Sequence, residues 1–218
     1  MTQDDLHQAI AVLKRDVRQW RVPVVGMIAN ETRDPFRILV SCLLSLRTKD
    51  ATTASASSRL FAWATTPEGL AALPVSTIEH LIYPVGFYRT KARSLKALCR
   101  DLLRRYRGRV PDDLDELLTL PGVGRKTANL AVTLGFGKPG ICVDTHVHRI
   151  TNRWGYVRTQ TPDATEQALR RKLPRPYWIV LNDLLVPYGQ HRCTPVSPFC
   201  SECGLHSWCR RVGVTRSR

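Results

Sequence analysis

The chain has 218 residues, 43% of them hydrophobic, which is enough for one large core or two small ones. Lysine and arginine number 33 against 18 acidic residues, which gives a formal net charge of +15. This charge predicts a polyanionic partner, with nucleic acid as the first candidate. The alternative is a basic surface that is simply solvated. The first six residues lack the features of a secretory signal. No apolar run reaches the roughly 20 residues that span a bilayer. We therefore expect a soluble intracellular protein with no membrane partner.

Apolar residues recur at helical spacing along most of the chain, and convincing alternating strands are absent. Thr2 can cap the first helix, and Pro35 and Pro67 can each open a later one. Ser76 and Glu79 have the spacing of a capping box. The pattern predicts an all-α protein without solenoid repeats. In chain order, the expected helices cover residues 6–20, the segments opened by Pro35, Pro67 and Ser76, residues 92–106, 114–120 and 125–136, a segment around Ile150, and residues 162–173 and 177–188.

The densest motif is Leu-Pro-Gly-Val-Gly-Arg-Lys-Thr-Ala at residues 120–128, where Gly122 and Gly124 separate two predicted helices. Glycine permits positive φ and the close approach of another backbone. The free N–H groups at the start of the second helix can bind a phosphate. The motif therefore predicts a helix–hairpin–helix element that holds duplex DNA by its backbone without reading sequence, with an ordinary tight turn as the alternative.

Lys126 and Asp144 are the candidate reactive pair. Lys126 lies in the first turn of the second hairpin helix, where the helix dipole opposes its positive charge. A neutral lysine amine can attack an electrophilic carbon and form a Schiff base, although a lone lysine at a helix start is more often a solvated charge or a phosphate contact. Asp144 taken alone is best read as a helix cap. Only the combination of Lys126 and Asp144 favours a catalytic role for either residue.

Four of the seven cysteines fall within 17 positions, separated by six, two and five residues. Such clustering in an intracellular chain favours a metal site over disulfides. Structural zinc usually takes two Cys-x-x-Cys pairs, and this chain has one, which favours an all-thiolate [4Fe–4S] cluster. The candidate ligands are Cys193, Cys200, Cys203 and Cys209, whereas Cys42, Cys99 and Cys142 lie in apolar surroundings and are expected to be core thiols.

Residues 120–129 and 143–149, together with their spacing, resemble the signature of the endonuclease III family, and the cysteine spacing is also that of the family. The similarity runs from about residue 35 to 210. It implies a helix–hairpin–helix DNA glycosylase fold with two helical lobes and a DNA-binding cleft between them. Residues 33–143 would form a central helical barrel, and residues 1–32 with 144–218 a discontinuous iron–sulfur lobe.

The resemblance also implies an activity. The protein would be a bifunctional DNA glycosylase and abasic-site lyase of base excision repair, acting on damaged, oxidised pyrimidines. Lys126 would attack C1′ of the damaged nucleotide and Asp144 would assist by stabilising positive charge on the sugar. The expected partner is double-stranded DNA with damaged bases or abasic sites, bound by a monomer in the cytoplasm, or at the nucleoid in a prokaryote. The implied DNA contacts of the hairpin region are Gly122, Val123, Gly124, Arg125, Thr127 and His146.

Two further loops resemble DNA-intercalating loops of the family. Residues 44–50 match Leu-Ser-x-Gln-Thr-Lys-Asp except that Arg47 replaces the glutamine that fills the space left by the flipped base. Arginine can still stack on or hydrogen-bond to the orphaned base, but its preference among opposite bases can differ. In residues 86–91, Phe87 would be an apolar wedge that unstacks the duplex, with a core position as the alternative.

Two other functions stay open at the level of sequence. A mismatch-specific glycosylase of the same superfamily would remove thymine, uracil or adenine, although such relatives generally lack a lysine at position 126. A non-catalytic iron–sulfur DNA-binding protein would keep the basic surface, the hairpin and the cysteines. It would not need both Lys126 and Asp144.

Overall fold

The computed structural model describes residues 2–20 and 24–218. Every regular element in these ranges is a helix and none is a strand, which confirms the predicted all-α fold. None of these helices is long and apolar enough to cross a membrane. The chain divides into two compact units, which we call the central unit (Val24–Gly140) and the terminal unit (Met1–Pro23 with Ile141–Arg218).

The central unit is built around one apolar core. Helix α3 is buried along nearly its whole length and packs against α2, α4, α9 and η2, while α5 and α6 pack against the long helix α7. The elements are α2 (Val24–Thr32), α3 (Pro35–Ser45), α4 (Asp50–Trp63), α5 (Pro67–Ala72), α6 (Val75–Ile82), α7 (Tyr88–Tyr106), α8 (Leu114–Leu118), α9 (Arg125–Leu130) and the π-helical turn η2 (Ala131–Gly135).

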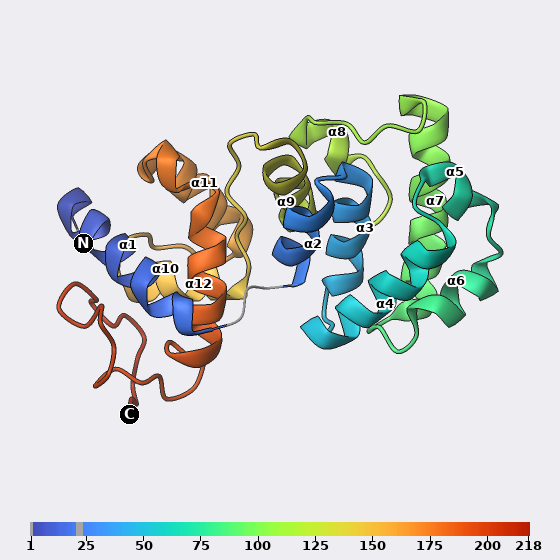
Figure 1. The fold of residues 1–218 in the computed structure, drawn as a ribbon. Helices are drawn as coiled ribbons and strands as arrows, with labels where there is room; N and C mark the ends of the chain where they lie inside the picture. Colours follow the sequence, from blue (N-terminus) through green and yellow to red (C-terminus); the bar gives the residue numbers. More distant parts are fainter. Residues whose placement is uncertain (1, 21–23) are drawn as a thin grey trace. The chain divides into compact units, whose positions relative to one another are not determined.

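The terminal unit has a second core, in which α10 packs against α11 and α12, and α1 against α12. Gly189 allows the close approach of α10, because a Cβ atom there would lie 2.4 Å from Nδ1 of His146. Beyond α12 the chain continues to Arg218 as turns without a helix (Figure 1). The elements are α1 (Gln3–Asp16), η1 (Val17–Gln19), α10 (Thr145–Arg153), α11 (Pro162–Lys172), η3 (Arg175–Tyr177) and α12 (Val180–His191).

Local sequence signals account for several helix starts. Thr2 forms a capping box with Asp5, and Asp34 caps α3 with Pro35 directly inside the helix. Thr66 and Pro67 open α5 in the same way. The predicted capping box of Ser76 and Glu79 is wrong: α6 begins at Val75, so Ser76 already lies inside the helix, and the N-cap position is held by Pro74, which has no side-chain donor or acceptor.

Two helices, α2 and α4, were not expected from the sequence, and α2 also affects the division of the chain. The sequence placed residues 1–32 in the lobe with the cysteines, but α2 packs against α3 and α4 and belongs to the central unit. At the other junction, Ile141 and Val143 are buried in the core of the terminal unit. These units are compact structural bodies, and the assignment of a function to each lobe stays a prediction.

Candidate functional site

The hairpin between α8 and α9 uses its two glycines differently. Gly122 has a φ of +77°, where L side chains are strained, and a Cβ atom there would lie 3.3 Å from Cβ of Ser94. Gly124 has a φ of −97° and is the N-cap of α9, and apart from its own chain neighbours no heavy atom lies within 4 Å of the position where its Cβ would be. Gly122 is therefore required by the turn itself, whereas Gly124 leaves open space in front of the start of α9.

The other predicted hairpin contacts differ in exposure. The side chains of Val123 and Thr127 are buried, so these residues can meet a ligand only through their backbone. Arg125 and Lys126, in the first turn of α9, are half-buried. Burial raises the pKa of the Cys42 thiol in α3 to about 12, and the positive charge of Lys126 opposes this shift. The lysine is thus close enough to α3 to act on a buried group there.

Asp144 is the N-cap of α10. Its Oδ1 accepts hydrogen bonds from the backbone nitrogens of His146 at 2.8 Å and Val147 at 2.9 Å. The capping role expected from local sequence is therefore present. His146 contacts Arg149, whose guanidinium lies 3.1 Å from the imidazole Nδ1. Asp144 and His146 belong to the terminal unit, whereas Lys126 belongs to the central unit.

The four clustered cysteines line one pocket of the terminal unit, together with Tyr188 and Arg153. All four are free thiols and none is fully buried. Burial raises the pKa of Cys209 to about 11 and also raises that of Cys203. Within residues 2–20 and 24–218, no three His, Cys, Asp or Glu side chains are placed as a group around a single metal-ion position. The pocket therefore gathers four sulfurs without placing them around one ion. As predicted, Cys42, Cys99 and Cys142 are buried.

Arginine side chains anchor the loop that carries these cysteines. Arg153 of α10 donates to the carbonyl oxygens of Thr194 and Pro195, each at 2.7 Å, and lies 3.3 Å from Sγ of Cys193. The hydroxyl of Tyr188 is 3.2 Å from Sγ of Cys203. These anchors were missed in the sequence because each joins residues 15 to 42 positions apart and no local pattern reports such a pair.

Arg47 and Phe87 lie next to one another. Both have positive φ values, 52° and 60°, and Cζ of Arg47 lies 5.6 Å from the centre of the Phe87 ring. Phe87 is 62% exposed, so the core position considered as an alternative is wrong. Arg47 is exposed as well. The structure therefore brings together two side chains that the sequence assigned separately to DNA-intercalating loops.

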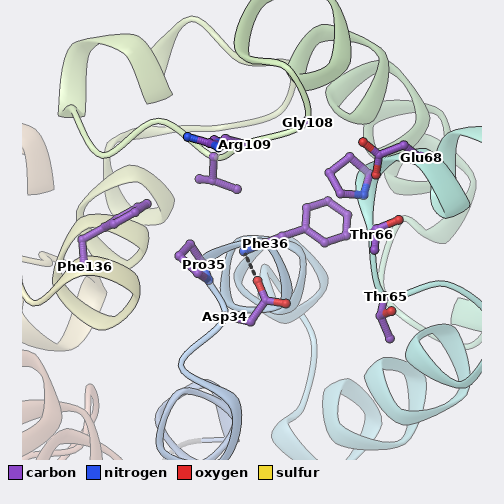
Figure 2. A pocket seen from close by; sticks show the side chains of 11 residues that line it. Asp34, Pro35, Phe36, Thr65, Thr66, Glu68, Gly108, Arg109 and Phe136 are labelled. Atoms are coloured by element: carbon purple, nitrogen blue, oxygen red, sulfur yellow. Dashed lines mark hydrogen bonds between the residues drawn. The ribbon is translucent and has the colours of Figure 1, made fainter.

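A different pocket of the central unit, with a volume of about 440 Å³, contains none of the predicted site residues (Figure 2). Asp34 at its edge is already engaged, because its carboxylate accepts a hydrogen bond of 2.8 Å from the backbone nitrogen of Phe36 (Figure 2). The pocket is lined by Asp34, Pro35, Phe36, Thr65, Thr66, Pro67, Glu68, Gly108, Arg109, Val110 and Phe136.

Comparisons with known proteins converge on one group. A family model described as HhH-GPD superfamily base excision DNA repair protein matches residues 40–175. The endonuclease III of Thermotoga maritima is 49% identical over 194 residues, which cover 87% of this chain and 91% of that relative. A non-covalent endonuclease III–DNA complex is similar with a TM-score of 0.85 and 34% identity, over 97% of this chain and 96% of that one. A trapped endonuclease III–DNA covalent intermediate gives the same score and identity over 97% of each chain.

Proposed function

Because the chain belongs to the HhH-GPD superfamily of base excision DNA repair proteins, and within it to the endonuclease III family, we propose that this DNA glycosylase and abasic-site lyase uses Lys126 as its nucleophile and Asp144 as the supporting carboxylate. The membership confirms the resemblance inferred from residues 120–149 and the cysteines. The observation that carries the proposal is the position of Lys126 in the first turn of α9, directly behind the glycine hairpin.

The proposed reaction passes through base loss, ring opening, β-elimination and imine hydrolysis, in that order. Nζ of Lys126 bonds to C1′ as the glycosidic C–N bond breaks, and the base leaves with the electron pair and takes up a proton. The C1′–O4′ bond then breaks, O4′ takes up a proton, and a protonated imine remains between Nζ and C1′. C2′ then loses a proton, and the C3′–O bond breaks as the 3′ phosphate leaves. Water hydrolyses the imine and frees the lysine.

Asp144 has two roles in this proposal. One carboxylate oxygen caps α10, which fixes the orientation of the side chain. The negative charge stabilises the positive charge that develops on the sugar as the base departs. An asparagine could perform the first role but not the second, and the two roles can be separated by experiment.

The hairpin would bind the DNA backbone on one side of the lesion. The unobstructed space in front of Gly124 allows a phosphate to approach the backbone N–H groups of Arg125 and its neighbours. The net charge of +15 supports the same partner, because neutralising phosphates releases counterions. We propose damaged, oxidised pyrimidines as substrates, with Arg47 contacting the orphaned opposite base.

Cys193, Cys200, Cys203 and Cys209 would hold a [4Fe–4S] cluster, a cofactor with which the endonuclease III family is generally associated. The donor set fits, since four free thiols share one pocket and no imidazole or carboxylate completes it. When bound, the cluster would supply four thiolate bonds that tie residues 193–209 together. Arg153 and Tyr188 would orient two of the sulfurs by hydrogen bonds.

Borohydride trapping tests the nucleophile. With duplex DNA carrying an abasic site, we expect a covalent complex with the wild type, because borohydride reduces the imine to a stable amine. Lys126→Gln should abolish trapping and strand cleavage and leave DNA affinity nearly intact. Lys138→Gln is the matched control, since Lys138 is a half-exposed lysine of the same unit, ion-paired with Asp112 at 2.7 Å. An equal loss of binding and cleavage in Lys126→Gln would contradict the assignment.

The pair Asp144→Asn and Asp144→Ala tests the carboxylate. Asparagine still accepts the N–H groups at the start of α10, so Asp144→Asn should keep wild-type helicity and lose base excision. Asp144→Ala should lose both excision and about 1 kcal/mol of stability. Wild-type excision by Asp144→Asn would leave the residue with its capping role alone.

A substrate panel separates the remaining alternatives. We expect excision of thymine glycol and dihydrouracil to exceed excision of thymine, uracil or adenine from mismatches, and the reverse order would favour a mismatch-specific enzyme. DNA binding without any trapped species would favour a non-catalytic binder. Arg47→Gln should change the relative rates with different bases opposite the lesion. The protein would act as a monomer on cytoplasmic or nucleoid DNA, which sedimentation of the DNA complex can check.

A further inference from the structure

Two loops of the central unit carry the side chains proposed to enter the duplex. The Arg47 loop (residues 46–49) joins α3 to α4, and the Phe87 loop (residues 83–87) joins α6 to α7. Arg47 and Phe87 both have left-handed backbone conformations. Residues other than glycine rarely adopt this conformation, and it persists only when the surrounding structure imposes it. Something in the fold must therefore hold both loops in these conformations.

Lys91 makes the principal connection between the loops. It lies one turn after Phe87 in α7, and its backbone nitrogen donates to the Phe87 carbonyl at 3.0 Å. Its Nζ donates to the carbonyl oxygens of Leu44 at 2.8 Å and Leu46 at 2.5 Å, and to Oγ1 of Thr48 at 3.2 Å. The three acceptors lie on both sides of Arg47. An ammonium group has three N–H donors, so this site uses all of them.

Thr48 completes the connection from the other side. Its hydroxyl donates to the carbonyl of Leu46 and accepts from Lys91 and from the backbone nitrogen of Gly86, each at 3.2 Å. A hydroxyl has one donor and two acceptor sites, so this one is fully used. Gly86 is needed for the approach, because a Cβ atom there would lie 2.5 Å from the carbonyl oxygen of Arg47.

We propose that Lys91 is a positioning residue that joins the two loops through Thr48 and Gly86, so that Arg47 and Phe87 form one preassembled wedge before DNA is bound. The inference rests on the proposed function, because it presumes that both side chains enter the duplex. Ordering the loops in the free protein removes an entropic cost that would otherwise oppose extrusion of the base. Lysine suits this role because its positive charge also meets the carbonyl groups at the C-terminal end of α3.

The test compares Lys91→Met with Lys96→Met. Lys96 lies on the same helix and is partly buried, but its Nζ donates to the carbonyl of Leu73 at 2.5 Å, which belongs to neither loop. The substrates are one duplex with thymine glycol and a neighbouring 2-aminopurine, and a second duplex with a preformed abasic site. The fluorescence of 2-aminopurine reports unstacking, and excision and strand cleavage are measured separately.

Lys91→Met should lower the fluorescence rise and reduce single-turnover excision of thymine glycol about tenfold. Cleavage at the abasic site should stay within about twofold, because no base has to be unstacked there. Lys96→Met should match the wild type in all three measurements. Lys91→Arg, which keeps N–H donors and the charge, should recover part of the loss.

Thr48→Val provides a second test if circular dichroism shows that Lys91→Met is not folded. It removes only the hydroxyl that joins Lys91 to Gly86, and it should show the same separation of excision from abasic-site cleavage. Equal loss of both activities in a folded variant, no loss of either, or the same effect in Lys96→Met would overturn the positioning role. Absence of trapping by the wild type on abasic DNA would instead refute the proposed function.

Discussion

The central unit and the C-terminal segment of the terminal unit are stabilised in different ways. The central unit has a continuous apolar core to which helices α3, α4, α6 and α7 contribute fully buried leucines and isoleucines. In residues 192–218, by contrast, only Pro198 and Leu205 are buried. Burial of apolar area is the main source of folding free energy, so the segment cannot be held by its own core.

Polar contacts take the place of that core. The guanidinium of Arg218 donates to the carbonyl of Ser197 at 3.1 Å and lies 4.0 Å from the centre of the Phe199 ring. Arg153 binds the start of the segment through two carbonyl oxygens. Such contacts contribute about 1 kcal/mol each in exposed surroundings. We therefore expect residues 192–218 to depend on a further cross-link, which four thiolate–iron bonds would supply.

The largest expected effect comes from breaking that cross-link. Cys203→Ser should give a colourless protein whose residues 192–218 are cut rapidly by protease, because the remaining contacts cannot hold the segment. The central unit should keep its helical circular dichroism. A stable brown variant, or a segment as resistant to protease as in the wild type, would contradict the proposed role of the cysteines.

Truncating a side chain in the core of the central unit should lower stability and leave the colour of the protein unchanged. Leu60→Ala removes a fully buried side chain of α4 and should cost about 2–5 kcal/mol in the free energy of unfolding, measured with guanidinium chloride. The visible absorbance of the folded variant should be unchanged, because Leu60 lies in the core of the central unit. Loss of colour before loss of helicity would show that the two regions are more tightly coupled than their separate cores indicate.

Substitution of the two hairpin glycines should separate stability from DNA binding within the central unit. Gly122→Ala should destabilise the protein by about 1–2 kcal/mol, because it forces an L side chain into positive φ close to Ser94. Gly124→Ala should change stability by less than about 0.5 kcal/mol and weaken DNA binding, because the new methyl group stands in the open space before α9. Thermal unfolding and a DNA titration of both variants measure the two effects separately. Equal changes in stability and in DNA affinity for the two variants would contradict these separate roles.

The smallest expected effect is a pH dependence that originates at Lys91. Burial lowers the pKa of this lysine from 10.5 to about 8. Between these values the unfolded chain binds more protons than the folded one, so the lysine's contribution to stability rises as pH increases from 8 to 10.5 and is flat below 8. The stability of the wild type relative to Lys91→Met should therefore increase over that range in denaturant titrations. A decrease would contradict the direction of the shift.

Much of the fold follows from short-range signals. Pro35 and Pro67 predicted where α3 and α5 begin, because the effect of a proline acts within the first helical turn. The structure adds the side-chain caps of Asp34 and Thr66 directly before them. The same local reasoning failed at Ser76, because the N-cap of α6 is Pro74, two residues earlier. Helix α4 was not expected because its buried face begins with Thr53, Ala56 and Ser57, which give little apolar periodicity.

Residue identity and spacing were enough to predict the family, which the comparisons confirm, and to propose the cysteine set and the hairpin lysine. Each of these depends on residues close together in the chain. The contacts that hold the Arg47 loop, the Phe87 loop and residues 192–218 depend instead on how the helices pack. Lys91 reaches acceptors 43 to 47 positions away, and Arg153 reaches carbonyl groups 41 and 42 positions away. A backbone carbonyl has no sequence signature, since every residue has one, and its partner becomes visible only once the helices are packed.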